Sequence, residues 1–179
     1  MRKIRRVALS LVLAVLLTLG LVGPALAGNP TVAITVTAEV VSITNTESVW
    51  GIGTVAVDAV VYFSATGSQD DDYSQIENTG TVAIDVEIQG TDIEGGDYDW
   101  TLADAAGSEI YSLYANNATT PTVYDKEVKD ASYVDILTDL AADGTSDWSM
   151  KFTAPTAFNA ADDGEEKSAT ITLVASKHT

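Results

Sequence analysis

The chain has 179 residues, of which 26 are acidic, nine are basic, one is histidine and none is cysteine, and its formal net charge is −17. This acidity leaves no basic surface for nucleic acid, and the lack of cysteine excludes disulfides and Cys-ligated zinc. With a single histidine, the chain has almost no residues from which to build a Ser-His-Asp triad or a multi-histidine metal site, so we do not expect an enzyme.

The first 27 residues have the pattern of a secretory signal peptide. Four of the nine basic residues lie in the first six positions, an apolar run follows over Val7–Val22, and Ala25-Leu26-Ala27 supplies the small residues of a cleavage site. The pattern predicts cleavage after Ala27 and a protein that is secreted or held at the cell surface. The alternative is an uncleaved membrane anchor. Gly23-Pro24 and the Ala-x-Ala end favour cleavage, which leaves no stable membrane span.

Residues 28–40 are predicted to form an N-terminal strand that can act as a donor strand. Val32, Ile34, Val36 and Val40 share one face of this strand, whereas the apolar residues that follow, Val41 and Ile43, have the opposite parity. A continuous strand cannot put both sets on one face. Either a bulge at Val40-Val41 reconciles them, or the two halves pack in different places, in the same molecule or in different ones.

Residues 41–179 are predicted to form a single domain of short strands separated by turns. The fold class that we expect is all-β, an antiparallel β-sandwich of the jelly-roll or immunoglobulin-like type. Two runs alternate clearly between apolar and other residues, with β-branched residues enriched; they are Thr54–Phe63 and Thr81–Gln89. Shorter strands are expected at Tyr98–Ala103, Glu109–Tyr114, Thr122–Val128, Asp147–Thr153 and Lys167–Ala175.

One stretch of this domain is ambiguous in its periodicity. Val134, Leu137, Leu140 and Ala141 follow helical spacing, which predicts a short helix over Tyr133–Ala142.

Acidic residues gather in the expected loops and suggest a calcium site. Hard cations such as Ca²⁺ take six to eight oxygen ligands from carboxylates and loop carbonyls. The best candidate surrounds a flexible glycine pair and offers Asp92, Glu94, Asp97 and Asp99. A second candidate is Asp70, Asp71 and Asp72. The alternative is a solvated acidic surface that binds no metal.

Three other features bear on binding and modification. Trp50, Trp100 and Trp148, with several tyrosines, could line a sugar-binding face, but we expect them to pack in the core. Asn117 begins a glycosylation sequon in an expected loop. His178, the penultimate residue, is expected to be frayed.

The layout resembles the TasA/camelysin-like secreted matrix proteins and similar archaeal pilus and tubule subunits. The resemblance lies in the signal peptide, the β-rich start of the mature chain, and a strand entry of the form I-x-N-x-G-x-V-x-hydrophobic, here Ile76-Glu77-Asn78-Thr79-Gly80-Thr81-Val82-Ala83-Ile84. It implies a jelly-roll subunit of an extracellular fibre that is joined to copies of itself by donor-strand exchange, sometimes with calcium. A second resemblance, to WxL cell-wall domains, rests on Trp100-Thr101-Leu102, while Trp148-Ser149-Met150 departs from that pattern.

These observations predict a secreted structural subunit of a filament, tubule or matrix that assembles by donor-strand complementation, with calcium as a candidate aid. The expected partners are copies of the same chain. The alternative function is a binding module for cell-wall or other polysaccharide at the cell surface.

Overall fold

The computed structural model describes residues 35–63, 73–117, 123–159 and 164–179. The predicted signal peptide, the start of the mature chain up to Ile34, and Asp70, Asp71 and Asp72 lie outside these ranges. The chain divides into two compact units, Met1–Thr37 and Ala38–Thr179. In the described part of the chain, no helix is long and apolar enough to cross a membrane.

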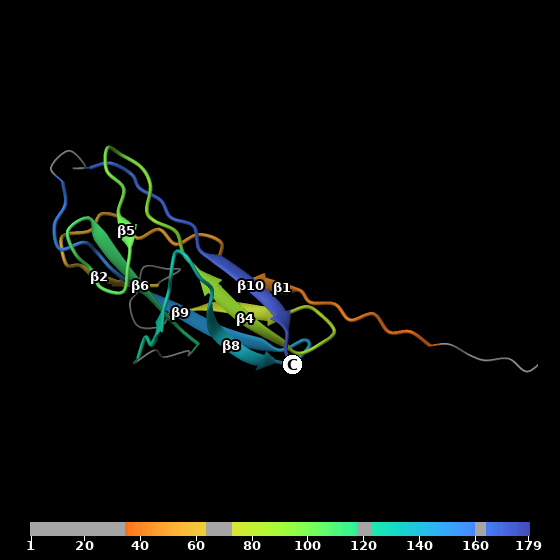
Figure 1. The fold of residues 1–179 in the computed structure, drawn as a ribbon. Helices are drawn as coiled ribbons and strands as arrows, with labels where there is room; N and C mark the ends of the chain where they lie inside the picture. Colours follow the sequence, from red (N-terminus) through yellow and green to blue (C-terminus); the bar gives the residue numbers. More distant parts are fainter. Residues whose placement is uncertain (1–34, 64–72, 118–122, 160–163) are drawn as a thin grey trace, which may run out of the picture. The chain divides into compact units, whose positions relative to one another are not determined.

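The second unit is an all-β sandwich, which confirms the expected fold class. In chain order, its strands are β1 (Ile43–Asn45), β2 (Val60–Tyr62), β3 (Ser74–Asn78), β4 (Ile84–Gln89), β5 (Thr101–Leu102), β6 (Ile110–Asn116), β7 (Lys126–Glu127), β8 (Val134–Leu140), β9 (Thr145–Thr153) and β10 (Thr172–Lys177). The larger sheet has the order β1-β3-β9-β6-β5, and in it β2 also pairs with β9 and β7 with β6. The smaller sheet has the order β10-β4-β8 (Figure 1).

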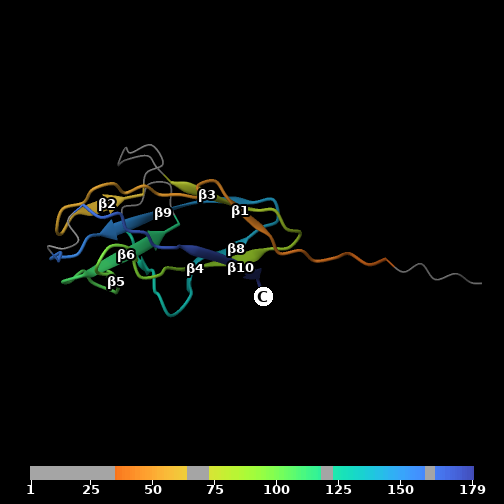
Figure 2. The ribbon, with the colours of Figure 1, turned by 90° about the horizontal axis from the view of Figure 1, so that it is seen from above.

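The nine-residue strand β9 is the centre of the larger sheet. Its first half pairs antiparallel with β3, from Thr145 to Trp148. Its second half pairs with β2 on one side and β6 on the other. In Figure 2, β1 and β3 lie above β4 and β10, so the two sheets are seen as separate layers.

The core lies between these layers and is apolar and aromatic. The smaller sheet contributes Ile84, Val86 and Ile88 of β4, which are 0% exposed. Their alternation with polar, half-buried neighbours is the pattern that predicted the strand. From the larger sheet, Trp148 lies 6.2 Å from Phe63 between ring centroids and donates its indole N–H to Asn45 Oδ1 at 2.9 Å.

The predicted helix over Tyr133–Ala142 is wrong, because the central seven residues of this stretch, Val134–Leu140, form β8. The pairing of β8 with β4 shifts register twice, between Ile84 and Val86 and between Val86 and Glu87. Ile136 and Leu137 are both buried, and Asp139 has a φ of 56°. Such irregularities break the period of two, so inward residues recur at a spacing that resembles a helix.

The predicted long strand over Thr54–Phe63 is reduced to its last third, β2. Asp58 has a φ of 58°, which a strand does not allow. The Ala59 N–H bonds back to the Ala56 carbonyl at 3.2 Å, so a turn precedes the strand. Val57 is consequently 48% exposed, although it has the same parity as buried Phe63.

Candidate assembly site

The described part of the predicted donor segment is exposed and lies in no strand of the described chain. Thr35, Val36 and Thr37 are all exposed, and Val36 keeps 84% of its surface accessible. Val32 and Ile34 lie outside the described residues, and Val40 is 45% exposed. The strand predicted from this segment's alternation therefore does not form within the described residues 35–40.

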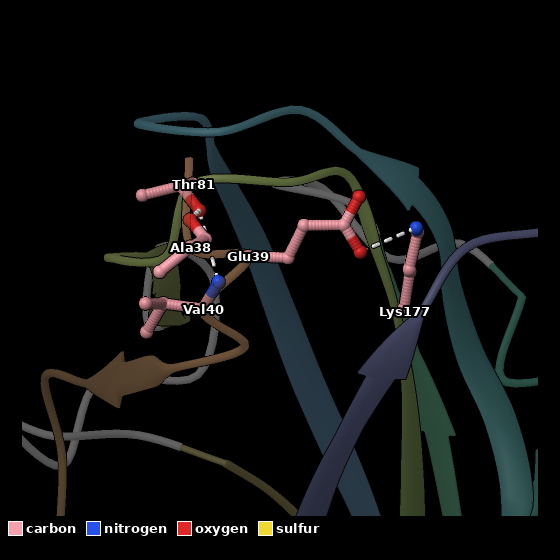
Figure 3. A network of polar contacts seen from close by, with 5 residues as sticks. All are labelled: Ala38, Glu39, Val40, Thr81 and Lys177. Atoms are coloured by element: carbon pink, nitrogen blue, oxygen red, sulfur yellow. Dashed lines mark hydrogen bonds and ion pairs between the residues drawn. The ribbon is translucent and has the colours of Figure 1, made fainter. Parts of the chain in front are cut away.

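The sandwich holds the chain from Ala38 onwards through a set of hydrogen bonds at Thr81. The Thr81 N–H donates to the Val40 carbonyl at 2.9 Å, and the Val40 N–H donates to Thr81 Oγ1 at the same distance. Thr81 Oγ1 donates in turn to the Ala38 carbonyl at 3.2 Å. Figure 3 shows these residues around Thr81, with the Glu39 side chain extended toward Lys177.

The Glu39–Lys177 ion pair adds little to this anchor. Its nitrogen and oxygen atoms lie 2.6 Å apart, but both side chains are about half exposed. Exposed ion pairs contribute roughly 0–1 kcal/mol because water and salt screen them. The hydrogen bonds made by the N–H and the hydroxyl of Thr81 therefore hold Ala38 and Val40 against the sandwich.

Two residues of the strand-entry motif shape the anchor. Gly80 passes so close to Val40 that an added Cβ would lie 2.2 Å from the Val40 carbonyl oxygen. Asn78 is fully buried, and its Oδ1 accepts the Gly80 N–H at 2.9 Å. The residues Asn78 to Gly80 of the motif therefore form the turn that Val40 contacts.

The apolar residues on the two sides of the parity change at Val40-Val41 differ in burial only at Ile43. Ile43, which belongs to the second apolar set, lies in β1 and packs against the core. Val36 and Val40, from the first set, are exposed, and Val41, the other member of the second set, is also 41% exposed. Of the apolar residues described on either side of the change, Ile43 therefore serves the core of this domain.

The far end of β10 is fastened rather than frayed, so the expectation for His178 is wrong. The His178 N–H donates to the Ala83 carbonyl at 2.9 Å, and its ring Nδ1 lies 2.7 Å from Asp85 Oδ1. The hydrogen bond from the Asp139 N–H and that with the His178 ring lower the pKa of Asp85. β10 therefore keeps its pairing with β4 up to its last residue, Lys177.

The first candidate calcium loop is already bridged by an ammonium group. Lys167 Nζ donates to the Gly95 carbonyl at 2.6 Å and to the Tyr98 carbonyl. Asp92 Oδ1 accepts the Leu102 N–H at 2.7 Å, and the Asp97 N–H donates to Glu165 Oε2 at 3.0 Å. Glu94 pairs through its main chain with Ser168, and Asp99 is exposed.

The loop carboxylates are not gathered in this conformation. No group of three or more acidic, histidine or cysteine side chains that could hold a metal is found among the described residues. Calcium binding by Asp92, Glu94, Asp97 and Asp99 stays a prediction.

Melting curves with calcium and with a chelator test that prediction. Binding to the native state alone stabilises it by about 2.7 kcal/mol when the ion is at a hundredfold excess over Kd. We expect a rise in Tm that an equal ionic strength of sodium does not produce, and a smaller rise in the variant Asp97→Asn/Asp99→Asn. Equal curves with both salts would identify the loop as a solvated acidic surface.

The tryptophans pack in the core, as expected. Trp148 and Trp100 are 3% and 9% exposed, and Trp50 is half-buried with its ring centroid 5.4 Å from that of Phe63. They therefore form no exposed platform on which a sugar could stack. The exposed aromatic residues among those described are tyrosines at positions 73, 98 and 133.

Asn117 is exposed and directly follows β6, so its side chain is accessible for glycosylation, which stays a prediction. The chain matches no protein-family model and no curated protein sequence.

Proposed function

We propose that this chain is a secreted structural subunit that polymerises into an extracellular filament, tubule or matrix by donating its N-terminal strand to a neighbouring copy. The observation that carries this proposal is the exposure of Val36 in a segment with strong strand periodicity. An extended peptide can add to a sheet edge, where its main chain forms hydrogen bonds and its alternate side chains fill pockets. Repeated head to tail, this contact generates an open fibre.

Two further features support strand donation. The hydrogen bonds at Thr81 fix Ala38 and Val40, the residues that directly follow the alternating stretch proposed as the donor. The chain also has no cysteine, so burial of apolar surface between copies replaces disulfide bridges as a source of stability.

Deleting residues 28–38 from the mature protein should abolish polymer while leaving a folded monomer. The deletion removes the alternating face but keeps Glu39, Val40 and the whole sandwich. Electron microscopy and sedimentation report polymer, and circular dichroism reports folding. A polymer that persists after the deletion would contradict the proposal.

A matched pair of full-length variants separates the two faces of the segment. Val32→Thr/Ile34→Thr/Val36→Thr keeps length and β-propensity but removes the apolar face, so we expect loss of polymer. Thr35→Ser/Thr37→Ser alters the other face and should leave assembly intact. If the mature protein is a monomer that binds cell-wall polysaccharide, the alternative function is favoured instead.

A further inference from the structure

Among the described residues, no strand pairs with the outer edges of β8 and β10 in the smaller sheet, and these two edges differ in how they are protected. Exposed strand edges invite pairing with other chains, and proteins commonly block them with charges, bulges or short length. The edge strand β8 carries Asp135 and Asp139, both exposed, together with two register shifts against β4. Asp139 also has a φ of 56°, which interrupts the strand geometry. This edge is therefore poorly suited to accept another strand.

The opposite edge, β10, has none of these devices along most of its length. It pairs with β4 over six consecutive residues without a register shift. The stretch from Ser168 to Ser176 contains no charged residue. The outer strands of the larger sheet offer an incoming strand fewer main-chain partners, because β1, β2, β5 and β7 are only two or three residues long.

The inner face of β10 is incompletely covered. Ile171, Leu173 and Ala175 pack against the core but are only half-buried. Their neighbours on β4, Ile84 to Ile88, are 0% exposed at the inward positions. A further strand beside β10 would cover this remaining apolar surface.

The edge is also held in place at both ends. Ser168 exchanges main-chain hydrogen bonds of 2.8 Å with Glu94, and the Thr170 N–H donates to Thr91 Oγ1 at 3.0 Å. At the other end, His178 bonds to Ala83 and Asp85. An incoming strand therefore meets an extended template that is already ordered, which lowers the entropic cost of binding.

We propose that the free edge of β10 is the acceptor for residues 31–38 of a second copy of this chain; the inference rests on the function proposed above. The donor, like the edge, carries no charge, whereas the whole chain carries −17. Two such segments can approach without the repulsion that acts between the rest of two acidic surfaces. Residues 31–38 span about 26 Å when extended, which is enough to pair with all six residues of β10, Thr172–Lys177.

The occupant is a second copy rather than the same one. Ala38 and Val40 are bound to Thr81, and Glu39 contacts Lys177 at the end of β10. Residues 35–39 contain no glycine, proline, asparagine or aspartate, the residues that tight reversals require, so the sequence offers no turn by which the segment would fold back onto its own β10.

Cysteine cross-linking between two species of the full mature chain tests this edge, on a background that lacks cysteine. Isotope-labelled Thr35→Cys protein is mixed with unlabelled Thr172→Cys, Val174→Cys or Ser176→Cys protein, assembled and oxidised. Facing residues on paired strands have Cβ atoms about 4.5–5.5 Å apart, which is close to disulfide geometry. Mass spectrometry then identifies disulfides that join a labelled to an unlabelled peptide.

We expect one of the three β10 positions to cross-link several-fold more than Thr138→Cys on β8, which is the control edge. Replacing Thr35→Cys with Val36→Cys should reduce the product, because residue 36 would face the core of the acceptor. Polymers that form normally but link to β8, or to none of the β10 positions, would overturn the inference and leave strand donation standing. If the protein stays monomeric, the result contradicts the proposed strand donation and therefore also this inference.

Discussion

Replacing Asn78 with aspartate is expected to lower the free energy of unfolding by about 4 kcal/mol, since the change puts a carboxylate among buried carbonyls. The two amide hydrogens of Asn78 Nδ2 are shared among the carbonyls of Val82, Leu140 and Ala141, at 2.8, 2.9 and 3.0 Å. The side chain is completely buried, so water cannot take over these bonds. An aspartate would leave the three oxygens without their donor and add a buried charge.

Urea unfolding measures this effect, and Asn117→Asp is the matched control. It makes the same chemical change at an exposed position, where we expect a change of less than about 0.5 kcal/mol. Burial among carbonyl oxygens should raise the pKa of the introduced carboxyl at position 78. The difference between the two variants should therefore shrink as the pH falls and that carboxyl takes up a proton. Equal free energies of unfolding for the two variants at neutral pH would show that the hydrogen bonds from Asn78 to Val82, Leu140 and Ala141 do not stabilise the fold.

Replacing Gly80 with alanine should detach residues 38–42 from the sandwich and cost about 2 kcal/mol, because the new methyl group overpacks the site. Its Cβ would lie 2.2 Å from the Val40 carbonyl oxygen and 3.1 Å from the Ser42 nitrogen, so the main chain must move. The movement breaks the Thr81–Val40 hydrogen bonds and the bond from the Thr79 N–H to the Ser42 carbonyl.

Hydrogen exchange at the Val40, Thr79 and Thr81 amides reports this detachment directly. Gly51→Ala is the control, because nothing lies within 4 Å of its added Cβ, and it should be neutral or slightly stabilising. Unchanged protection at the three amides in Gly80→Ala would show that the anchor does not depend on the close approach.

The sequence predicted those strands whose alternation survives intact in the fold. Residues 81–89 alternate without interruption, and β4 occupies 84–89 of them with its apolar residues fully buried. Asp147–Thr153 likewise falls within β9. In both strands the apolar residues at alternate positions are buried, so the spacing of apolar residues matches the side-chain period of a strand.

Prediction failed where the main chain departs from that period. The bulged pairing of β8 with β4 imitates helical spacing, and the turn before β2 ends an alternation that otherwise reads as one strand. Neither departure has a glycine or proline to mark it, since aspartates at 58 and 139 adopt the positive φ. The pairing of β9 with strands far away in the chain leaves no local trace at all.

The sequence also could not predict the hydrogen bonds at Thr81. The alternation identified residues 31–40 as apolar on one face, but not that Thr81 binds the chain at Ala38 and Val40. The close approach of Gly80 to Val40 joins residues 40 positions apart, which periodicity cannot register. The lysine that bridges the acidic loop, Lys167, likewise comes from a distant part of the chain.

The place of β9 in the sheet also dictates the order in which the chain can become stable. Its partners β2, β3 and β6 all precede it, and each is synthesised well before residues 145–153. Contacts of such long sequence separation form slowly, because a large loop must close before any pairing is gained. Until the ribosome has released β9, the larger sheet lacks its central strand, and the earlier strands stay open to misassociation. A nascent chain arrested before Thr145 therefore remains sensitive to protease, whereas one extended past Thr153 can begin to close.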